Sequence, residues 1–321
     1  MYNVLRSDPK ENHNLTILCG GIDMVFDTIT EYLEYITQEF LEEINGMNSY
    51  CDLKNVSFKN GLLPNYNNRA QALLYCLRYH FGYAFEYEYI YNNHILGNIM
   101  NDQINVLSVG CGNGIDLWSL NHAIEESFPR IKQINYIGVD PIDWGEKFTG
   151  TQGDNIQYYY CPITQAESSL RFLRDIDVLF LPKSISELKR FDLECIANIV
   201  APKTNWICLA ASFRTEENNF LDDMNKFDNL IEFFEDYGFT IVSGEKNKAY
   251  ICEDKAIISI YSDFVYPDDT LDLIMNLHNE CSSRSDDSRE CNCRCQSTLS
   301  RNPILKATQV RYNCVIMAKL N

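Results

Sequence analysis

The sequence is poor in basic residues. It holds 27 Lys and Arg against 45 Asp and Glu, which gives a formal net charge of −18. No run of lysines or arginines occurs, and the longest basic grouping is Lys189-Arg190. Proteins that bind nucleic acid neutralise phosphates with a basic face, and a strongly acidic surface repels polyanions and anionic membranes. The composition therefore argues against free nucleic acid and against membranes as partners.

The sequence also lacks a long apolar run. A membrane-spanning helix needs about 18–20 consecutive apolar residues, and every unbroken stretch here is far shorter. The first residues, 1–14, are polar, so we expect no signal peptide there. The 13 cysteines are scattered through the chain. Without a secretory route, reduced thiols are the default, so we predict a cytoplasmic protein.

Histidine is scarce, and no metal-ligand or triad spacing is visible. Of the five histidines, His80 is the best candidate for a proton acceptor, although a histidine packed in the interior is the simpler interpretation. Cys281, Cys291, Cys293 and Cys295 invite a zinc interpretation, but alternating Cys-x-Cys spacing suits a tetrahedral site less well than paired knuckles. Their segment, 276–302, has few large apolar side chains. We therefore expect a flexible loop there and no metal.

Two regions of the chain differ in periodicity. Residues 15–99 carry helical repeats of apolar residues, at 22–44 and again at about 67–92. From residue 100 to 321, short β runs alternate with helices, the pattern of parallel βαβ units in a sheet covered on both faces. We predict an α/β fold: a Rossmann-like, doubly wound, mostly parallel seven-stranded sheet preceded by an N-terminal helical extension that acts as a substrate lid. The strand-like runs are 105–109, 134–139, 156–160, 177–181, 206–211, 239–243, 256–261 and 310–317.

The first βα turn carries the most specific motif. The strand 105–109 ends in Gly110-Cys111-Gly112-Asn113-Gly114, and a helix follows. Glycines at alternate positions let the backbone approach a ligand that any Cβ would block. The next strand ends at Asp140, and adjacent strand ends of a doubly wound sheet lie side by side, so this carboxylate can accept hydrogen bonds from a ribose diol. The pattern predicts a nucleoside cofactor at the carboxyl edge of the sheet.

Two classes of cofactor fit such a turn. The dinucleotide fingerprint needs a third glycine where this chain has Ile115, which disfavours an NAD(P)-dependent oxidoreductase. Residues 106–114 and 136–140 instead resemble the first and second motifs of class I S-adenosylmethionine-dependent methyltransferases. The resemblance covers about residues 100–320, and it implies S-adenosyl-L-methionine as the cofactor and an antiparallel hairpin at the end of the sheet. The cofactor contacts that it implies come from Ser108, Gly110, Cys111, Gly112, Gly114, Asp140, Pro141 and Ile163.

The chain departs from that family in two places. The family often has an acid where this chain has Ser108, which removes one contact near the ammonium group of the cofactor. The segment 182–187 lacks the Asn/Asp-Pro-Pro-aromatic signature of members that methylate adenine, cytosine or glutamine nitrogens. Glu187 lies either at the active site or in a capping box with Ser184. Trp144 either flanks the adenine, as Ile142 could, or packs beneath a loop.

The resulting prediction is a methyltransferase with an unidentified acceptor, a small molecule or a protein. The sequence names no catalytic residue, because methyl transfer depends mainly on in-line orientation and amine or thiol acceptors need no base. Tyr75, Tyr79, Tyr83 and Tyr87 recur every four residues and are either core or the wall of an acceptor pocket. A non-catalytic protein that keeps the cofactor fold is the alternative. The oligomeric state is open.

Overall fold

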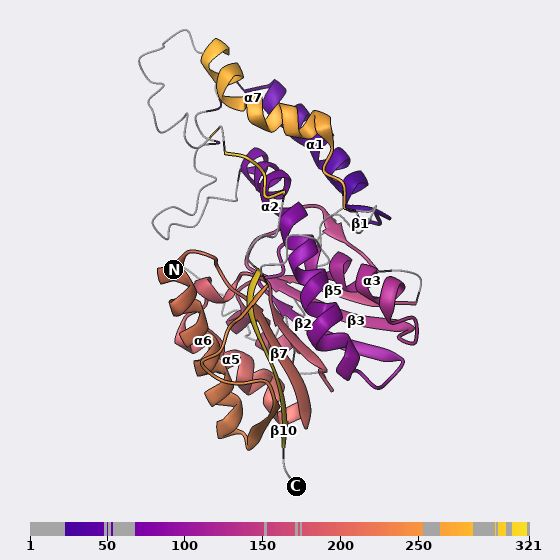
Figure 1. The fold of residues 1–321 in the computed structure, drawn as a ribbon, viewed down its shortest axis with the longest axis vertical. Helices are drawn as coiled ribbons and strands as arrows, with labels where there is room; N and C mark the ends of the chain where they lie inside the picture. Colours follow the sequence, from indigo (N-terminus) through magenta and orange to yellow (C-terminus); the bar gives the residue numbers. More distant parts are fainter. Residues whose placement is uncertain are drawn as a thin grey trace, which may run out of the picture.

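A single mixed sheet forms the centre of the molecule (Figure 1). The computed structural model describes residues 23–47, 50, 53, 68–150, 153–170, 173, 175–252, 264–284, 299, 301–305 and 310–319. The strand order is β5-β3-β2-β6-β7-β10-β8, and β9 pairs with β10. The strands are β2 (Gln103–Val109), β3 (Gln133–Asp140), β5 (Asn155–Tyr160), β6 (Val178–Leu181), β7 (Trp206–Ser212), β8 (Phe239–Ser243), β9 (Tyr250–Cys252) and β10 (Val310–Lys319).

The pairing confirms the predicted fold class. Strands β5, β3, β2, β6 and β7 are parallel, whereas β10 runs antiparallel to β7, β8 and β9. Leaving out the short β9 and numbering the others along the chain gives the order 3-2-1-4-5-7-6. This is the sheet of class I methyltransferases, with the last strand inserted antiparallel between its two predecessors. The predicted strand 256–261 lies outside the described residues.

Helices cover both faces of the sheet because the side chains of each strand alternate between two apolar clusters. On β7, Cys208 and Ala210 join one cluster, and Ile207, Leu209 and Ala211 join the other. One face carries α2 (Arg69–Ile90) and α3 (Ile115–Ser127), and the other carries α4 (Ile163–Leu170), α5 (Arg190–Val200) and α6 (Glu217–Asp236). In the part of the chain that is described, no helix is long and apolar enough to cross a membrane.

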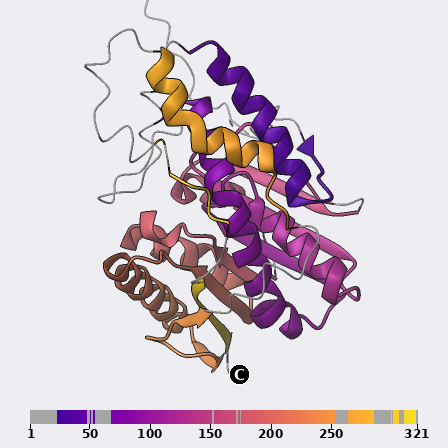
Figure 2. The same cartoon turned by 45° about the horizontal axis from the view of Figure 1, so that its top comes forward.

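A helix from the C-terminal part of the chain, which the sequence did not reveal, packs on the N-terminal helical extension. Helices α1 (Ile29–Asn45) and α7 (Asp268–Arg284) lie side by side over one end of α2 (Figures 1 and 2). The Thr37 and Thr270 hydroxyls join them at 2.7 Å. The prediction of a loop from residue 276 is wrong for 276–284, which are helical because an apolar stripe, including buried Cys281, packs inward. Cys291, Cys293 and Cys295 lie outside the described residues.

Helix α2 is buried on more than one side. A short segment, Leu299 with 301–305, crosses it, and we call this segment the strap. The Ile304 amide donates to the Arg78 carbonyl oxygen at 2.8 Å. A Cβ at Gly82 would lie 2.5 Å from Ile304 Cγ2 and 3.2 Å from the Ile304 carbonyl oxygen. Gly82, unexpected inside a helix, therefore allows the strap to lie against α2.

Gly82→Ala is expected to lower the free energy of unfolding by about 1–3 kcal/mol, because the added methyl overpacks the contact with the strap. This is a net loss: the cost of overpacking must be larger than the gain of about 1 kcal/mol that replacing glycine by alanine normally brings to a helix. In the background Ile304→Ala, the same substitution should cost less, since the clashing methyl is gone. Gly97→Ala is the control, as nothing lies within 4 Å of its Cβ position. Chemical denaturation of the four variants measures the coupling; equal effects in both backgrounds would contradict it.

Candidate functional site

The glycine turn after β2 requires left-handed backbone at each glycine. The φ angles are +72° at Gly110, +60° at Gly112 and +88° at Gly114. A Cβ at Gly110 would collide with Ser184, and one at Gly114 would collide with the Tyr158 hydroxyl. At Gly112 the nearest atoms belong to the Trp144 ring, 3.8 Å away. The turn is thus packed tightly at both ends, while Gly112 presents bare backbone to the space in front of the sheet.

Asp140 lies beside this turn, as the sequence predicted. Its carboxylate accepts hydrogen bonds from the backbone N–H groups of Gly112 and Ile142, each at 2.9 Å. The Trp144 indole N–H donates to the same carboxylate at 3.4 Å. The side chain is 7% exposed, and burial raises its pKa from 3.8 to about 6, against the lowering effect of these three donors. The carboxylate therefore remains ionised at neutral pH and can accept further hydrogen bonds.

Trp144 closes the front of the turn. Its ring contacts Tyr75, with centroids 5.4 Å apart, and His80 at 6.4 Å. The following strand β4 (Lys147–Phe148) pairs with β1 (Asp23–Met24), and Glu146 forms a short ion pair with Arg69 at the start of α2. The loop after β3 is thereby tied to the helical extension. Contact of Trp144 with an adenine ring stays a prediction.

A second link joins the extension to the glycine turn. The amide of Asn113 donates to the Tyr32 hydroxyl at 2.9 Å, and this hydroxyl contacts His80 Nδ1 at 2.7 Å. His80 is 3% exposed, and burial lowers its pKa to about 3, so the ring is neutral. This position favours the interpretation of His80 as a packed histidine that holds Tyr32 over the turn.

A buried acid that the sequence analysis missed lies behind the turn. Asp116, in the first turn of α3, is fully buried and accepts from the Tyr136 hydroxyl at 2.9 Å. Burial raises its pKa to about 7, while the Tyr136 hydrogen bond and the nearby Ser108 hydroxyl oppose the rise. The acid that the family often has at position 108 is absent, but Asp116 supplies a carboxyl group beside that serine. The sequence signal for this buried acid was the position of Asp116, two residues after the last glycine of the turn, Gly114.

The loop after β6 brings a buried lysine to the same edge. Lys183 has a left-handed φ of +57°, unusual for a residue with a side chain. Its ammonium group pairs with the Glu86 carboxylate of α2 at 2.7 Å, and both side chains are nearly buried. The Ser212 hydroxyl donates to Glu86 as well. This ion pair connects α2 to the ends of β6 and β7, and sequence alone could not reveal a pairing across 97 positions.

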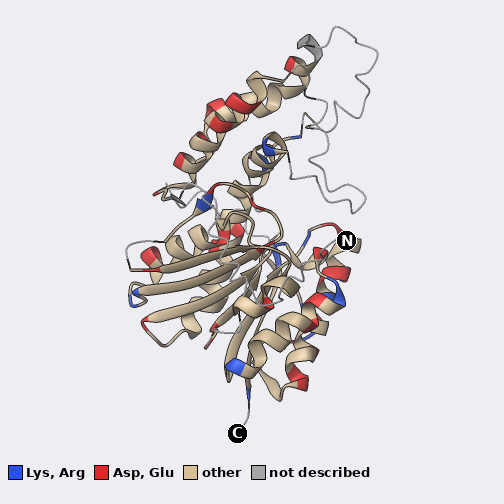
Figure 3. Cartoon of the chain, turned by 180° about the vertical axis from the view of Figure 1, so that it is seen from behind, with Lys and Arg blue, Asp and Glu red and all other residues tan. Residues whose placement is uncertain are grey.

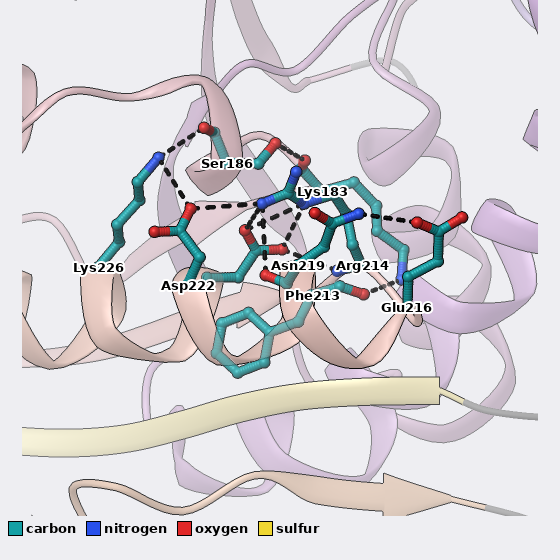
Figure 4. Close-up of polar contacts among 9 residues, drawn as sticks. Lys183, Ser186, Phe213, Arg214, Glu216, Asn219, Asp222 and Lys226 are labelled. Carbon is teal, nitrogen blue, oxygen red and sulfur yellow. Dashed lines mark hydrogen bonds and ion pairs between the residues drawn. The ribbon is translucent and has the colours of Figure 1, made fainter. Parts of the chain in front are cut away.

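Polar contacts fix this loop against the one after β7 (Figure 4). Lys183 donates to the Phe213 carbonyl oxygen at 2.5 Å, and Lys226 donates to that of Ser186 at 2.6 Å. Arg214 pairs with Asp223 at 2.5 Å. Of the two alternatives for Glu187, the capping box with Ser184 is wrong, because the Ser184 hydroxyl instead donates to the Val109 carbonyl oxygen at 2.5 Å.

Glu187 is an exposed titratable residue in the loop after β6. The residue is exposed to solvent, yet protein atoms surround much of its carboxylate. This partial burial and the nearby Asp140 charge raise the pKa of Glu187 to about 7. Arg214 and Lys226 oppose the rise. The group thus exchanges a proton near neutral pH, as a general acid or base requires.

The tyrosine stripe of α2 forms a continuous row between Trp144 and Lys183. Tyr75 contacts Tyr79 with centroids 4.8 Å apart, and Tyr79 stacks on Tyr83 at 5.8 Å. Trp144 extends the row beyond Tyr75, and the Lys183 ammonium lies 5.8 Å from the Tyr83 ring centroid. The row therefore runs along the edge that carries the glycine turn and Glu187.

The structure brings some of the predicted cofactor residues together and separates others. Gly110, Gly112 and Gly114 form one turn at the end of β2, and Asp140 at the end of β3 contacts its middle glycine, Gly112. The side chains of Ser108, Cys111 and Ile163 are buried in the two apolar layers, so any contact with a ligand would come from their backbone. Pro141 is exposed beside Asp140.

Comparisons with known proteins find similarity in structure only. No family model matches the chain, and no curated protein matches it in sequence. A cyclopropane-fatty-acyl-phospholipid synthase-like protein from Lactobacillus casei is 13% identical, with 90% of this chain and 100% of that one covered and a TM-score of 0.39. The plantazolicin methyltransferase BpumL, solved with S-adenosylhomocysteine, is 13% identical over 91% and 100% of the chains, with a TM-score of 0.34.

A third solved structure is phosphoethanolamine N-methyltransferase 2 from Haemonchus contortus in complex with S-adenosyl-L-methionine. It is 12% identical, with 74% of this chain and 57% of that one covered and a TM-score of 0.31. The present chain thus matches less than two thirds of that protein. Likeness at this distance carries no conclusion about activity. The strand order of the chain itself defines its class: the fold is that of class I methyltransferases.

Lys183→Met is expected to lower the free energy of unfolding by about 3–5 kcal/mol, because it leaves the Glu86 carboxylate buried without its cation. The double variant Lys183→Met/Glu86→Gln should recover a large part of that loss. Lys246→Met is the control, since its pair with Glu235 is exposed and worth about 0–1 kcal/mol. Urea denaturation measures all three. Equal losses at Lys183 and Lys246 would show that the buried pair does not hold α2 to the sheet.

Proposed function

We propose that the chain binds S-adenosyl-L-methionine at the carboxyl edge of the sheet and transfers its methyl group to an acceptor beneath the helical extension. The observation that carries the proposal is the contact between Gly112 and Asp140. It places bare backbone and an ionised carboxylate side by side at the ends of β2 and β3, next to the point where the strand order reverses. Open α/β sheets bind their ligands at such points.

Two features favour this cofactor over a dinucleotide. The antiparallel β10 between β7 and β8 is the mark of the methyltransferase sheet, whereas dinucleotide-binding sheets end in parallel strands. Ile115 stands where the dinucleotide fingerprint has a glycine that permits close packing of helix and strand. Its side chain is 4% exposed and packs in the apolar layer between α3 and the sheet.

The bound cofactor would supply an electrophilic methyl group on a sulfonium, so the protein needs mainly to bind and orient. Asp140 would accept hydrogen bonds from the ribose hydroxyls, and the Gly112 backbone would permit close approach of the cofactor. Trp144 and Tyr75 exclude water from the front of the turn. Glu187, in the loop after β6, can take up a proton at its carboxylate when an acceptor loses one.

The arrangement favours a small-molecule or protein acceptor over free nucleic acid. The net charge of −18 opposes polyanions. The tyrosine row offers aromatic faces of the kind that stack on a planar or apolar group. The described cysteines are free thiols, in keeping with the cytoplasmic location expected from the sequence.

S-Adenosylhomocysteine is expected to bind more weakly as the pH falls through about 6, where the Asp140 carboxyl gains its proton. The ionised form accepts hydrogen bonds better, so affinity should be full above pH 7. Asp140→Asn should weaken binding about 10- to 100-fold at pH 7.5, equivalent to about 1–3 kcal/mol, and remove the pH dependence. Calorimetric titrations between pH 5 and 8 measure both effects.

The unliganded protein should show the opposite trend in the contribution of Asp140 to stability. A pKa raised from 3.8 to about 6 means that the unfolded chain releases its proton first. This contribution is therefore full below about pH 4 and is lost as the pH rises through 6.

Asp143→Asn is the matched control for the titrations, because Asp143 is exposed on the same loop and contacts only local backbone in the described structure. Its affinity and pH profile should equal those of the wild type. Binding of NAD in place of S-adenosylhomocysteine would support the oxidoreductase alternative. Tight binding of S-adenosylhomocysteine without methyl transfer to any acceptor in a radiolabel screen would support the non-catalytic alternative.

A further inference from the structure

Helix α2 contains a buried arginine whose charge no residue in the described part of the chain balances. Arg78 is 0% exposed and is among the largest fully buried side chains. Its Nη2 donates to the Leu299 carbonyl oxygen at 3.0 Å, whereas Nε and Nη1 have no hydrogen-bond partner among the residues that the structure describes. An isolated buried charge costs several kcal/mol, and such unpaired donors in a native structure call for an explanation.

The side chains around Arg78 add positive charge and supply no negative charge. The charged or polar side chains that influence it are Tyr79, Tyr266 and Arg301, and the one charge among them is another cation. Burial and the Arg301 charge lower the pKa of Arg78 to about 10, so the guanidinium is still ionised at neutral pH. Acidic residues outnumber basic ones (Figure 3). Among the described residues, none of the side chains that influence Arg78 is acidic.

Arg301 connects this site to the tyrosine row. It is exposed on the strap, and its guanidinium lies over the Tyr79 ring, 5.7 Å from the centroid. Tyr79 in turn stacks on Tyr83 and contacts Tyr75. The two arginines therefore lie beside the middle of the row that joins Trp144 to Lys183.

The strap covers Arg78 in the present conformation. Leu299 accepts from the guanidinium, and the Ile304 amide donates to the Arg78 carbonyl oxygen one turn from the Gly82 contact. These contacts hold the strap through few hydrogen bonds. A ligand that reaches Arg78 must displace this segment, and in doing so it gains two unused donors.

We propose that Arg78 and Arg301 form a binding site for an anionic group of the methyl acceptor, a carboxylate or a phosphate, with the body of the acceptor along the tyrosine row. The donors left free on Arg78 would make charge-assisted hydrogen bonds, which are about twice as strong as neutral ones. Arg301 would close over the anion with the strap. The acceptor class rests on the proposed methyltransferase function, whereas the anion site can be tested without it.

The experiment is a thermal unfolding series with inorganic phosphate or benzoate at about 10 mM, each against sodium chloride of equal ionic strength. We expect the better anion to raise the Tm of the wild type by about 2 °C over the chloride sample. Arg78→Met should lose this shift. Without anion, its Tm should equal or exceed that of the wild type, because replacing an unbalanced buried charge by an apolar side chain of similar volume is neutral or stabilising.

Arg130→Met is the matched control. Arg130 also donates to carbonyl oxygens, those of Leu96 and Ile99, but it lies at the end of α3, away from the strap. This variant should keep the shift. Arg301→Gln changes an exposed side chain and should reduce the shift even if Arg78→Met does not fold. Phosphate alone or benzoate alone giving the shift identifies the anionic group as a phosphate or a carboxylate.

An equal shift in wild type, Arg78→Met and Arg301→Gln would overturn the site, as would no shift in the wild type with either anion. Titration of S-adenosylhomocysteine into the same proteins separates the two proposals. If Arg78→Met loses the anion-induced Tm shift but binds S-adenosylhomocysteine as tightly as the wild type, both the anion site and the cofactor site are supported. An anion shift without any S-adenosylhomocysteine binding would leave the anion site standing and reject the methyltransferase function.

Discussion

The hydrogen bond between the Gly112 N–H and the Asp140 carboxylate is the contact on which the site depends. This hydrogen bond requires β2 and β3 to be adjacent and in register, so that their ends meet. It also requires a turn with positive φ angles, which glycine adopts most readily. The Gly110 amide reinforces it by donating to the Val139 carbonyl oxygen at 2.7 Å. Once this turn is set, Trp144, Tyr32 and the loop after β6 are all positioned against it.

A second constraint comes from the helical extension, which contacts the edge of the sheet at several separate points. Arg69 pairs with Glu146, Tyr32 accepts from Asn113, and Glu86 pairs with Lys183. These are charged or polar contacts between α1 or α2 and loops at the carboxyl edge. They place an aromatic helix over the turn, and so an acceptor would have to enter between that helix and the loops, or beneath the strap.

Local pattern was enough to predict seven strands of the main sheet, the glycine turn and the position of Asp140, because these depend on residues close together in sequence. The short β1, β4 and β9 were missed, and the predicted strand 256–261 is untested. The partners of α2 could not be predicted in this way. Gly82 is explained by its contact with Ile304, 222 positions away, and the burial of Arg78 follows from packing that no local pattern reveals. Helix α7 was missed because its apolar stripe is short and its segment is rich in polar residues; its contact with α1 spans 233 positions.

The central claim is that a cofactor occupies the space in front of Gly112 and Asp140, which Trp144 now borders. The most direct test is the fluorescence of Trp144 in a chain whose other tryptophans, Trp118 and Trp206, are replaced by Phe. S-Adenosylhomocysteine should change the emission of this single indole in a saturable way, because the ligand must contact its ring or take its place on the carboxylate. An emission unaffected by S-adenosylhomocysteine, in a protein that retains its fold, would contradict the account.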